Sequence, residues 1–379
     1  MRFLFASDSF KGSLSSARAA ELLDVAAREA FPDVRTSSLV VADGGEGTVE
    51  AVVAATGGEL RTVRVTGPRG GVVDATYGLM DGGRAIIEMA AASGLPLLEA
   101  GERDPRLTST FGTGELIRHA LDEGARHVTL ALGGSATNDG GMGCMRALGA
   151  RFVDDEGREL EGVGGDLRRV SLIDRSHLDT RIAGTSFHVM CDVTNPLLGP
   201  RGATRVFGPQ KGAAPAVVEE LERGMQNYAA RLAETFVGFD PTAPGMGAAG
   251  GMGAACRAFL DAEASPGIEQ VLGLVGFDAL VGDCDLCVTG EGHADSQSAH
   301  GKVVSGVAAH CRRAGVPCVA IVGGMSEDAV ELLSYGVDAL VPTVIDVCPL
   351  DEAIGRAEQN YLLAARRVFS LLRLGRSLA

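Results

Sequence analysis

The sequence predicts an α/β protein with two domains, and three observations support this prediction. Its 379 residues exceed what one hydrophobic core usually organises. Strand-like and helix-like segments alternate near both ends of the chain, which is typical of a doubly wound parallel sheet. Between these ends, residues 60–89 form alternating segments joined by tight turns, which is typical of antiparallel strands.

The individual elements follow from hydrophobic period and turn residues. We expect strands at residues 2–6, 35–41, 61–65, 72–79, 84–89, 127–132, 187–191, 285–288, 318–322 and 339–342. We expect helices at residues 15–31, 47–56, 113–123, 143–148, 217–236, 254–262, 302–313, 327–335 and 350–374. Residues 151–185 are charged and rich in loop formers, and they predict no definite element.

This order predicts that one domain interrupts another. Residues 1–58 and 268–379 are expected to form a doubly wound parallel-sheet domain of the Rossmann or flavodoxin-like kind. Residues 59–267 are expected to form an inserted mixed α/β domain, with the active site in the cleft between the two.

Composition excludes several classes of protein. The net charge of −15 argues against nucleic acid or an anionic membrane surface as the main partner. No apolar run is long enough for a signal peptide or a membrane span. The eight cysteines show no disulfide spacing, which predicts a reduced, cytoplasmic protein. A homodimer is an open alternative to a monomer.

Lysine is rare, and each lysine lies beside a glycine. Of 34 cationic residues only Lys11, Lys211 and Lys302 are lysines, and the others are arginines. A compact ammonium next to a flexible backbone suits the capture of phosphate or carboxylate, although a composition bias could leave three lysines by chance.

Two polar loops follow the first two predicted strands. Asp8, Ser9 and Lys11 lie in the first loop, where a helix N-terminus favours an anion. The second loop has the sequence Ala-Asp-Gly-Gly-Glu-Gly-Thr and contains Asp43, Gly44, Gly45 and Glu46. Carboxylates repel phosphate, so Mg²⁺ or a substrate hydroxyl is the natural partner there. Capped or solvated turns are the alternative for both loops.

A third loop, residues 133–143, is the richest in glycine. Its free backbone amides and hydroxyl side chains form a concavity suited to anions, although a flexible linker is the alternative. The candidate binding residues of this loop are Gly134, Ser135, Thr137, Asn138 and Asp139.

Two further loops complete the set. Asp192 and Asn195 follow a predicted strand, and the glycine-rich segment after them ends at Lys211. The last loop lies between a strand and a helix and contains Glu291, Asp295, Ser296, Gln297 and Lys302. A solvated turn at Asp192 is the alternative in the first of these loops.

Five glycine-rich loops with acids in all of them and lysines in three favour phosphoryl transfer, in which the protein positions two substrates and neutralises charge. The sequence contains neither a Walker nucleotide motif nor a nucleophile elbow. A dehydrogenase that uses NAD(P) on a small hydroxy acid and a regulator that binds a small molecule are the alternatives.

The five motifs resemble, in this order, those of the bacterial glycerate kinases of type 1, from residue 2 to about residue 370. The resemblance implies phosphorylation of D-glycerate with ATP and Mg²⁺, with 2-phosphoglycerate favoured over 3-phosphoglycerate as the product. It departs at His293, where an arginine-like residue is expected in many relatives.

The resemblance and the chemistry of the loops together suggest roles. Asp192 or Asp295 would orient the glycerate hydroxyl or accept its proton. Lys11, Lys211 and Lys302 would divide between the ATP phosphates and the substrate carboxylate, with Lys11 also counted as catalytic. Asp43 and Glu46 would hold Mg²⁺, and the loop 133–143 would take part of the nucleotide or the glycerate.

Overall fold

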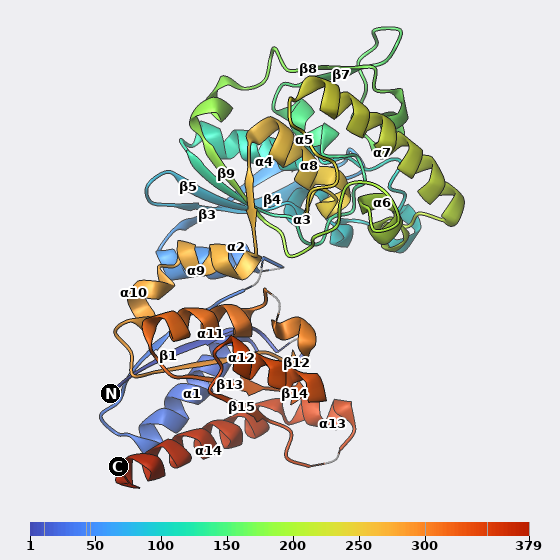
Figure 1. Cartoon of the computed structure of the whole chain (residues 1–379). Coiled ribbons are helices and arrows are strands. Elements are labelled where there is room, and N and C mark those ends of the chain that lie inside the picture. Colours follow the sequence, from blue (N-terminus) through green and yellow to red (C-terminus); the bar gives the residue numbers. More distant parts are fainter. Residues whose placement is uncertain (11, 43, 46, 300, 347, 379) are drawn as a thin grey trace. The chain divides into compact units, whose positions relative to one another are not determined.

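The computed structural model shows an α/β chain that divides into two compact units (Figure 1). The structure describes residues 1–10, 12–42, 44–45, 47–299, 301–346 and 348–378. Unit 1 comprises Met1–Asp43 and Pro266–Ala379, and unit 2 comprises Gly44–Ser265. Mixed α/β character with parallel strands is therefore confirmed.

Unit 1 is built on a five-stranded parallel sheet with the order β15-β13-β11-β1-β2. Its strands are β1 (Arg2–Ser7), β2 (Arg35–Ser38), β11 (Leu286–Gly290), β13 (Cys318–Val322) and β15 (Ala339–Pro342). A separate short parallel pair joins β12 (His293–Ala294) to β14 (Gly324–Met325). Its helices are α1 (Ser16–Ala30), α9 (Gly267–Leu274), α10 (Phe277–Val281), α11 (Val303–Ala314), α12 (Leu332–Tyr335), α13 (Leu350–Gly355) and α14 (Ala357–Leu378).

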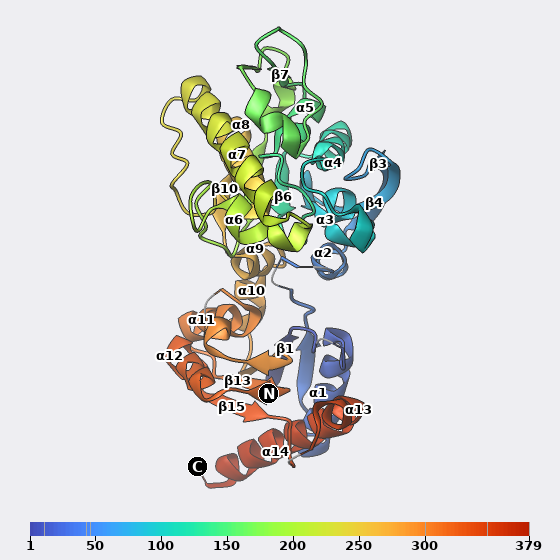
Figure 2. The ribbon, with the colours of Figure 1, turned by 90° about the vertical axis from the view of Figure 1, so that its right-hand side faces the viewer.

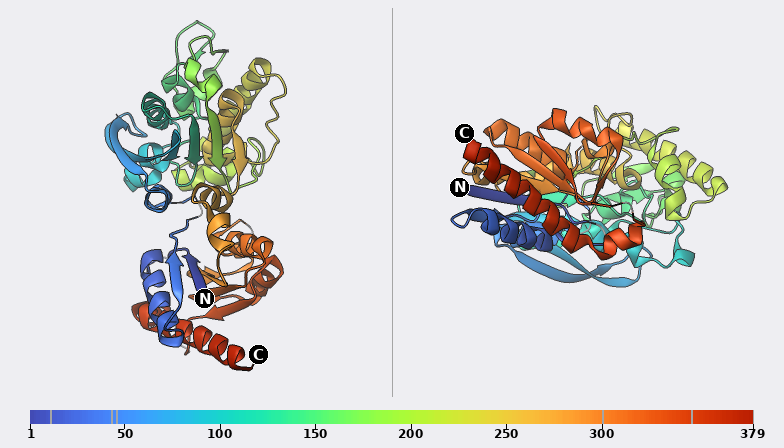
Figure 3. Two further views of the ribbon diagram at one scale, coloured as in Figure 1. Left: turned by 90° about the vertical axis from the view of Figure 1, so that its left-hand side faces the viewer. Right: turned by 90° about the horizontal axis from the view of Figure 1, so that it is seen from below.

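Helices cover both faces of this sheet because its strands are apolar on both sides. In β1, Phe3 and Phe5 point to the face covered by α1 and α14, whereas Leu4 and Ala6 point to the face covered by α9 to α12. Figure 1 shows α11 on one face of the sheet and α1 with α14 on the other, and the right-hand view of Figure 3 shows α14 running past α1. Ser15 caps α1 by accepting a hydrogen bond from the backbone of Arg18.

Unit 2 contains a six-stranded mixed sheet with the order β10-β9-β6-β5-β4-β3. Its main strands are β3 (Glu59–Thr66), β4 (Val72–Met80), β5 (Arg84–Glu88), β6 (His127–Ala131), β9 (Ser186–Met190) and β10 (Glu263–Ser265). Its helices are α2 (Thr48–Thr56), α3 (Ala90–Ser93), α4 (Phe111–Asp122), α5 (Met142–Ala147), α6 (Ala203–Phe207), α7 (Pro215–Thr235) and α8 (Ala248–Leu260). In this sheet the meander β3-β4-β5 is antiparallel, as the sequence predicts, and the pairs β5-β6, β6-β9 and β9-β10 are parallel.

Alternating side chains of unit 2 face two layers of helices. Ile87 of β5 belongs to the large core that also includes α4, α5, α7 and α8. Gly78 of β4, on the opposite face, lies so close to α2 that an added Cβ would come within 2.4 Å of Val53. Figure 2 shows α7 and α8 lying together, away from the β3–β4 edge.

Helix α2 explains where the units divide. The sequence assigned residues 1–58 to the first domain, but α2 packs on β4, and the backbone N–H of Val49 donates to Glu88 at the end of β5. The structure therefore places residues 44–58 in unit 2.

Three other elements differ from their expected bounds. Strand β2 ends at Ser38, before residue 41. The expected C-terminal helix is interrupted at Arg356, between α13 and α14. Helix α8 starts earlier than residue 254, with a left-handed turn at Ala249, Gly250 and Gly251 before its regular part.

The undefined stretch 151–185 folds into short pieces. They are β7 (Arg151–Val153), η3 (Gly164–Arg169), β8 (Leu172–Asp174) and η4 (Thr180–Gly184), where η denotes a 3-10 helix. None of the helices in the described ranges combines the length and the apolar character needed to cross a bilayer.

Candidate active site

Unit 1 contains a cavity of about 510 Å³ at the carboxyl ends of its parallel strands. Four of the residues singled out in the sequence line it, and these are Asp8, Ser9, Glu291 and Lys302. This edge is where ligands bind in open parallel sheets. The same cavity is also lined by residues of α13 and α14, which no sequence motif indicated.

The loop after β1 is fastened to the end of β11. The backbone N–H of Asp8 donates to the carbonyl oxygen of Gly290 at 2.9 Å, and the carboxylate of Asp8 accepts from the backbone of Ser9 at 2.7 Å. Gly290 also lies close to β13, because an added Cβ would lie 2.0 Å from the carbonyl oxygen of Ile321. Lys11, the third candidate of this loop, lies outside the described residues.

Glu291 is a buried acid in this cavity. Its side chain is 7% exposed, and loss of solvation raises its pKa from the ordinary 4.5 to about 7. The charges of Asp8 and Asp295 raise this pKa further, whereas Ser298 and Lys302 lower it. Its Oε1 atom has no hydrogen-bond partner within the described part of the chain. A cation or a hydrogen-bond donor on a ligand would satisfy that oxygen.

Asp295 has a structural task as well as a candidate catalytic one. Its Oδ1 accepts from the backbone N–H groups of Gln297 at 2.9 Å and Ser298 at 3.2 Å, which starts the 3-10 helix η6 (Ser296–Ala299). Asp295, Ser296 and Gln297 are not among the residues that line the cavity. Lys302 lines it and forms the N-cap of α11, with no side-chain hydrogen bond at that cap.

His293 also lines the cavity, and its exposed ring is paired with Ser326 at 3.1 Å.

No group of three or more His, Cys, Asp or Glu residues with metal-binding geometry occurs in the described ranges. All eight cysteines are unpaired by disulfides.

In unit 2, the two glycine-rich loops meet. A Cβ on Gly133 would lie 3.3 Å from the carbonyl oxygen of Gly44 and 3.9 Å from the Cα atom of Gly45. Gly134 has a φ of +71°, a conformation that favours glycine. The structure thus brings together two of the predicted loops, while Asp43 and Glu46 lie outside the described residues.

Lys211 is buried beneath the loop 133–143. Its Nζ donates to the hydroxyl of Ser135 and to the carbonyl oxygen of Thr137, both at 2.7 Å. Burial lowers its pKa from 10.5 to about 7, although the nearby charge of Asp139 opposes that shift. These two bonds fix the backbone of the loop, so Lys211 acts on it from inside the protein.

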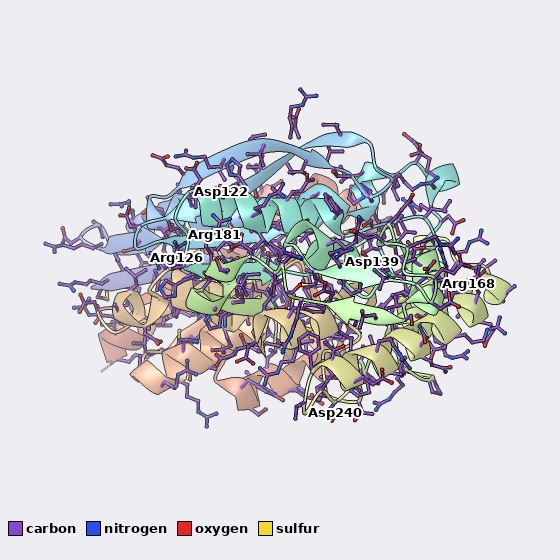
Figure 4. The ribbon with its side chains drawn as sticks, turned by 90° about the horizontal axis from the view of Figure 1, so that it is seen from above. Asp122, Arg126, Asp139, Arg168, Arg181 and Asp240 are labelled. Carbon is purple, nitrogen blue, oxygen red and sulfur yellow. The ribbon has the colours of Figure 1, made fainter. Side chains whose placement is uncertain are left out.

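Asp139 is fully buried and organises the same loop. Its carboxylate accepts from the backbone N–H and the hydroxyl of Thr110, at 2.8 and 2.7 Å, and from the backbones of Gly141 and Gly143, both at 3.1 Å. Burial raises its pKa, and these four bonds oppose the shift. Asp139, labelled in Figure 4, is completely buried among these donors. The sequence proposed a ligand contact here, and the structure shows a carboxylate occupied by protein donors.

Two neighbouring polar atoms have no protein partner in the described ranges. They are Thr137 Oγ1 and Asn138 Oδ1, both buried, while Asn138 Nδ2 donates to Thr204 at 3.2 Å. Such buried polar atoms call for a ligand or a water molecule.

In the loop after β9, the side chain of Asn195 donates to the carbonyl oxygen of Arg201 at 2.7 Å, and Asp192 is exposed.

The two sets of strand-end loops belong to an α/β chain of two units, and its comparisons with known proteins identify the class of enzyme. The glycerate kinase family profile matches residues 3–373. The chain belongs to the glycerate kinase family and is an enzyme of the kinase class.

Relatives with known names align with this chain over almost its whole length. The chain is 46% identical to the glycerate 2-kinase of Escherichia coli K12 over 376 residues, which cover 99% of both chains. It is 44% identical to the glycerate kinase of Bacillus subtilis 168 over 381 residues, which cover 100% of this chain and 99% of the relative. A crystal structure of a candidate glycerate kinase 2 from Salmonella typhimurium LT2 matches with a TM-score of 0.90 and 45% identity, covering 100% of this chain and 99% of the other.

Proposed function

We propose that this chain transfers the γ-phosphoryl group of ATP to D-glycerate and forms 2-phosphoglycerate. The observation that carries the proposal is the grouping of Asp8, Glu291 and Lys302 around one cavity at the strand ends. A cation and two acids around one space suit a phosphate chain that arrives with its own metal ion. Family membership and the name of the Escherichia coli relative, a 2-kinase, support the choice of acceptor and product.

Mg²⁺ fits the chemistry of these donors. It binds through one or two carboxylates together with substrate phosphates, and it does not need a full protein cage. Asp43 and Glu46 are its ligands proposed from the sequence. Within unit 1, the unpartnered Oε1 of Glu291 offers an oxygen to a metal ion that arrives with the phosphates. When bound, Mg²⁺ neutralises charge on the phosphates.

The residues of the chain would hold the anions and the reacting hydroxyl. Lys302 and Lys11 would contact the ATP phosphates. In unit 2, the amides of the loop 133–143 and the hydroxyl of Ser135 would bind the glycerate carboxylate or part of the nucleotide, with Lys211 fixing that loop. We propose a cytoplasmic enzyme, and whether it forms a homodimer is open to measurement of its mass in solution.

Either Asp192 or Asp295 would orient the glycerate hydroxyl or take its proton. Replacing Asp295 with Asn separates its charge from its structural role, because Asn retains the Oδ1 acceptor that caps η6 and removes only the charge. We expect turnover to fall by about a hundredfold or more, with an unchanged melting temperature. The same change at Asp192 tests the other candidate.

The experiment is a coupled assay of ADP formed from ATP and D-glycerate, with phosphorus NMR of the product. A signal of 2-phosphoglycerate supports the proposal, and a 3-phosphoglycerate signal overturns its regiochemistry. Absence of ADP, or reduction of NAD(P)⁺ by glycerate, would exclude the reaction itself. Near-normal turnover of the Asp295→Asn enzyme would remove that residue from the catalytic candidates.

A further inference from the structure

The cavity of unit 1 has two walls of different chemistry. The strand ends supply a polar wall with Asp8, Glu291 and Lys302. Helices α13 and α14 supply an apolar wall that includes Ile354 and Ala357. Its volume of about 510 Å³ lies within the range of about 300 to 1,000 Å³ that is usual for ligand sites. The site therefore suits a ligand that is apolar at one end and polar at the other, and a phosphate chain that carries its own metal ion fits a polar wall with two acids and one lysine.

The apolar wall is larger than glycerate can use. Leu350 is 75% exposed and Ile354 is 40% exposed, although both line the cavity. Each carbon of glycerate carries an oxygen, so its binding would leave this wall uncovered. A planar base has two apolar faces, and stacking it here would remove the wall from water.

Asn360 provides a polar group within this part of the cavity. It belongs to the first turn of α14, is 8% exposed and lines the cavity. Within the described part of the chain, no hydrogen bond engages its side-chain amide. The protein uses neither the donor nor the acceptor of this amide, so both can bond to water or to a ligand in the cavity, and a ligand with a matching acceptor and donor would engage both.

The hydrogen-bond donor and acceptor of that amide are complementary to one edge of adenine. An Asn side chain can accept from the exocyclic N6 amino group and donate to the neighbouring ring nitrogen of adenine. Guanine has an oxygen acceptor where adenine has the amino group, so the same amide cannot make both bonds unless it turns over.

The polar end suits phosphates. Among the described residues that line the cavity, Lys302 is the one lysine or arginine, and it lies at the N-terminus of the twelve-residue helix α11. The cavity also lies over β1 and β11, where the strand order reverses direction, which is the usual nucleotide crevice of a doubly wound sheet. Figure 1 shows α13 and the start of α14 at the β12–β14 end of the unit.

We propose that this cavity is the nucleotide site, with adenine against the wall formed by α13 and α14, Asn360 reading its edge, and the phosphates near Lys302. This assignment rests on the proposed function for the choice of a nucleoside triphosphate. It adds the location of the base and a residue that determines nucleotide specificity.

The first test compares Asn360→Ala with Gln359→Ala. Gln359 is the adjacent amide on α14, and it is exposed and does not line the cavity, so its replacement is the matched control. For Asn360→Ala, we expect the KM for ATP to rise about tenfold and the ratio of kcat/KM for ATP over GTP to fall about tenfold. The KM for D-glycerate and the parameters of Gln359→Ala should stay unchanged. An unchanged ATP-to-GTP ratio, or a rise in KM for glycerate alone, overturns the assignment.

The second test does not depend on catalysis. Ala357→Phe places a ring where the base would stack, and calorimetry with ADP measures binding to the whole protein. We expect binding to weaken at least tenfold relative to wild type, with circular dichroism showing retained secondary structure. Unchanged ADP affinity overturns the assignment. If wild type binds ADP but transfers no phosphoryl group to glycerate, the proposed function fails while this titration still decides the location of the base.

Discussion

Glu291 shows how one residue can couple stability to ligand binding. Its pKa is about 7 in the folded chain and near the ordinary 4.5 when unfolded. Between these values the folded state binds more protons than the unfolded state, so stability falls as pH rises from about 4.5 to 7. A cation at the unpartnered Oε1 would favour the charged form and recover that loss.

We therefore predict that Glu291→Gln changes the pH dependence of stability. Relative to wild type, the free energy of unfolding of the variant should rise by about 1 to 3 kcal/mol between pH 4.5 and 7.5, because the neutral amide never has to ionise in the cavity. Urea titrations at several pH values measure this difference. The exposed Glu327→Gln is the control, and a constant difference between Glu291→Gln and wild type across this range would show that burial does not penalise the charge.

For single residues, the sequence located the polar loops better than it predicted what each side chain in them contacts. The rarity of lysine drew attention to Lys211, but its burial depends on the segments that cover it, which no local pattern records. Asp139 was proposed to face a ligand, and four protein donors occupy it. The sequence gives no signal for Asn360, because one amide in an amphipathic helix looks like an ordinary surface residue until a cavity is found beside it.

Among the elements, the left-handed entry to α8 supports the loop 133–143. Gly250 has a φ of +69°, and its carbonyl oxygen accepts from the backbone of Gly140 at 3.0 Å. A Cβ at Gly250 would lie 2.1 Å from the carbonyl oxygen of Thr137, one of the two acceptors of Lys211. The backbone of the loop therefore fits against this turn only when residue 250 is a glycine.

We predict that Gly250→Ala is strongly destabilising and also lowers activity. The loss should be about 2 to 4 kcal/mol, because positive φ and a backbone overlap act together. Thermal unfolding and turnover are the measurements. Gly273→Ala in α9 is the matched control, since a Cβ there meets nothing within 4 Å and alanine favours a helix. Equal melting temperatures for the two variants would contradict this account of the turn.

Helices and strands with a clear hydrophobic period were predictable from the sequence. Segments that are organised by side-chain hydrogen bonds were not. The parallel strands and the antiparallel meander follow from their patterns. The stretch 151–185 is instead organised by Asp154, whose carboxylate accepts from the backbones of Glu156 and Arg158 and from the guanidinium groups of Arg158 and Arg169. These bonds hold its pKa low, at about 2, against the opposing effect of desolvation. A sequence period carries no record of such contacts.

For the whole molecule, the chain order determines which parts can fold alone. The two main sheets share no strand, and the buried residues of the large core of unit 2 lie between Val65 and Ala262. Unit 1 instead depends on both chain ends, because β1 lies between β2 from the N-terminal segment and β11 from the C-terminal segment. An interrupted domain of this kind cannot form from either segment by itself.

We predict that residues 44–265 fold as an independent domain without kinase activity. This fragment retains all six strands of its sheet and the whole of its large core, so it should unfold cooperatively and give a dispersed NMR spectrum. Residues 44–379 are the informative comparison. That longer fragment lacks β1 and α1. Its second part would therefore expose the edge of β11 that pairs with β1 and the apolar face that α1 covers, and it should aggregate or unfold in one portion. A disordered 44–265 fragment would show that the inserted unit needs its host, and the division at residues 43 and 265 would then not mark a folding boundary.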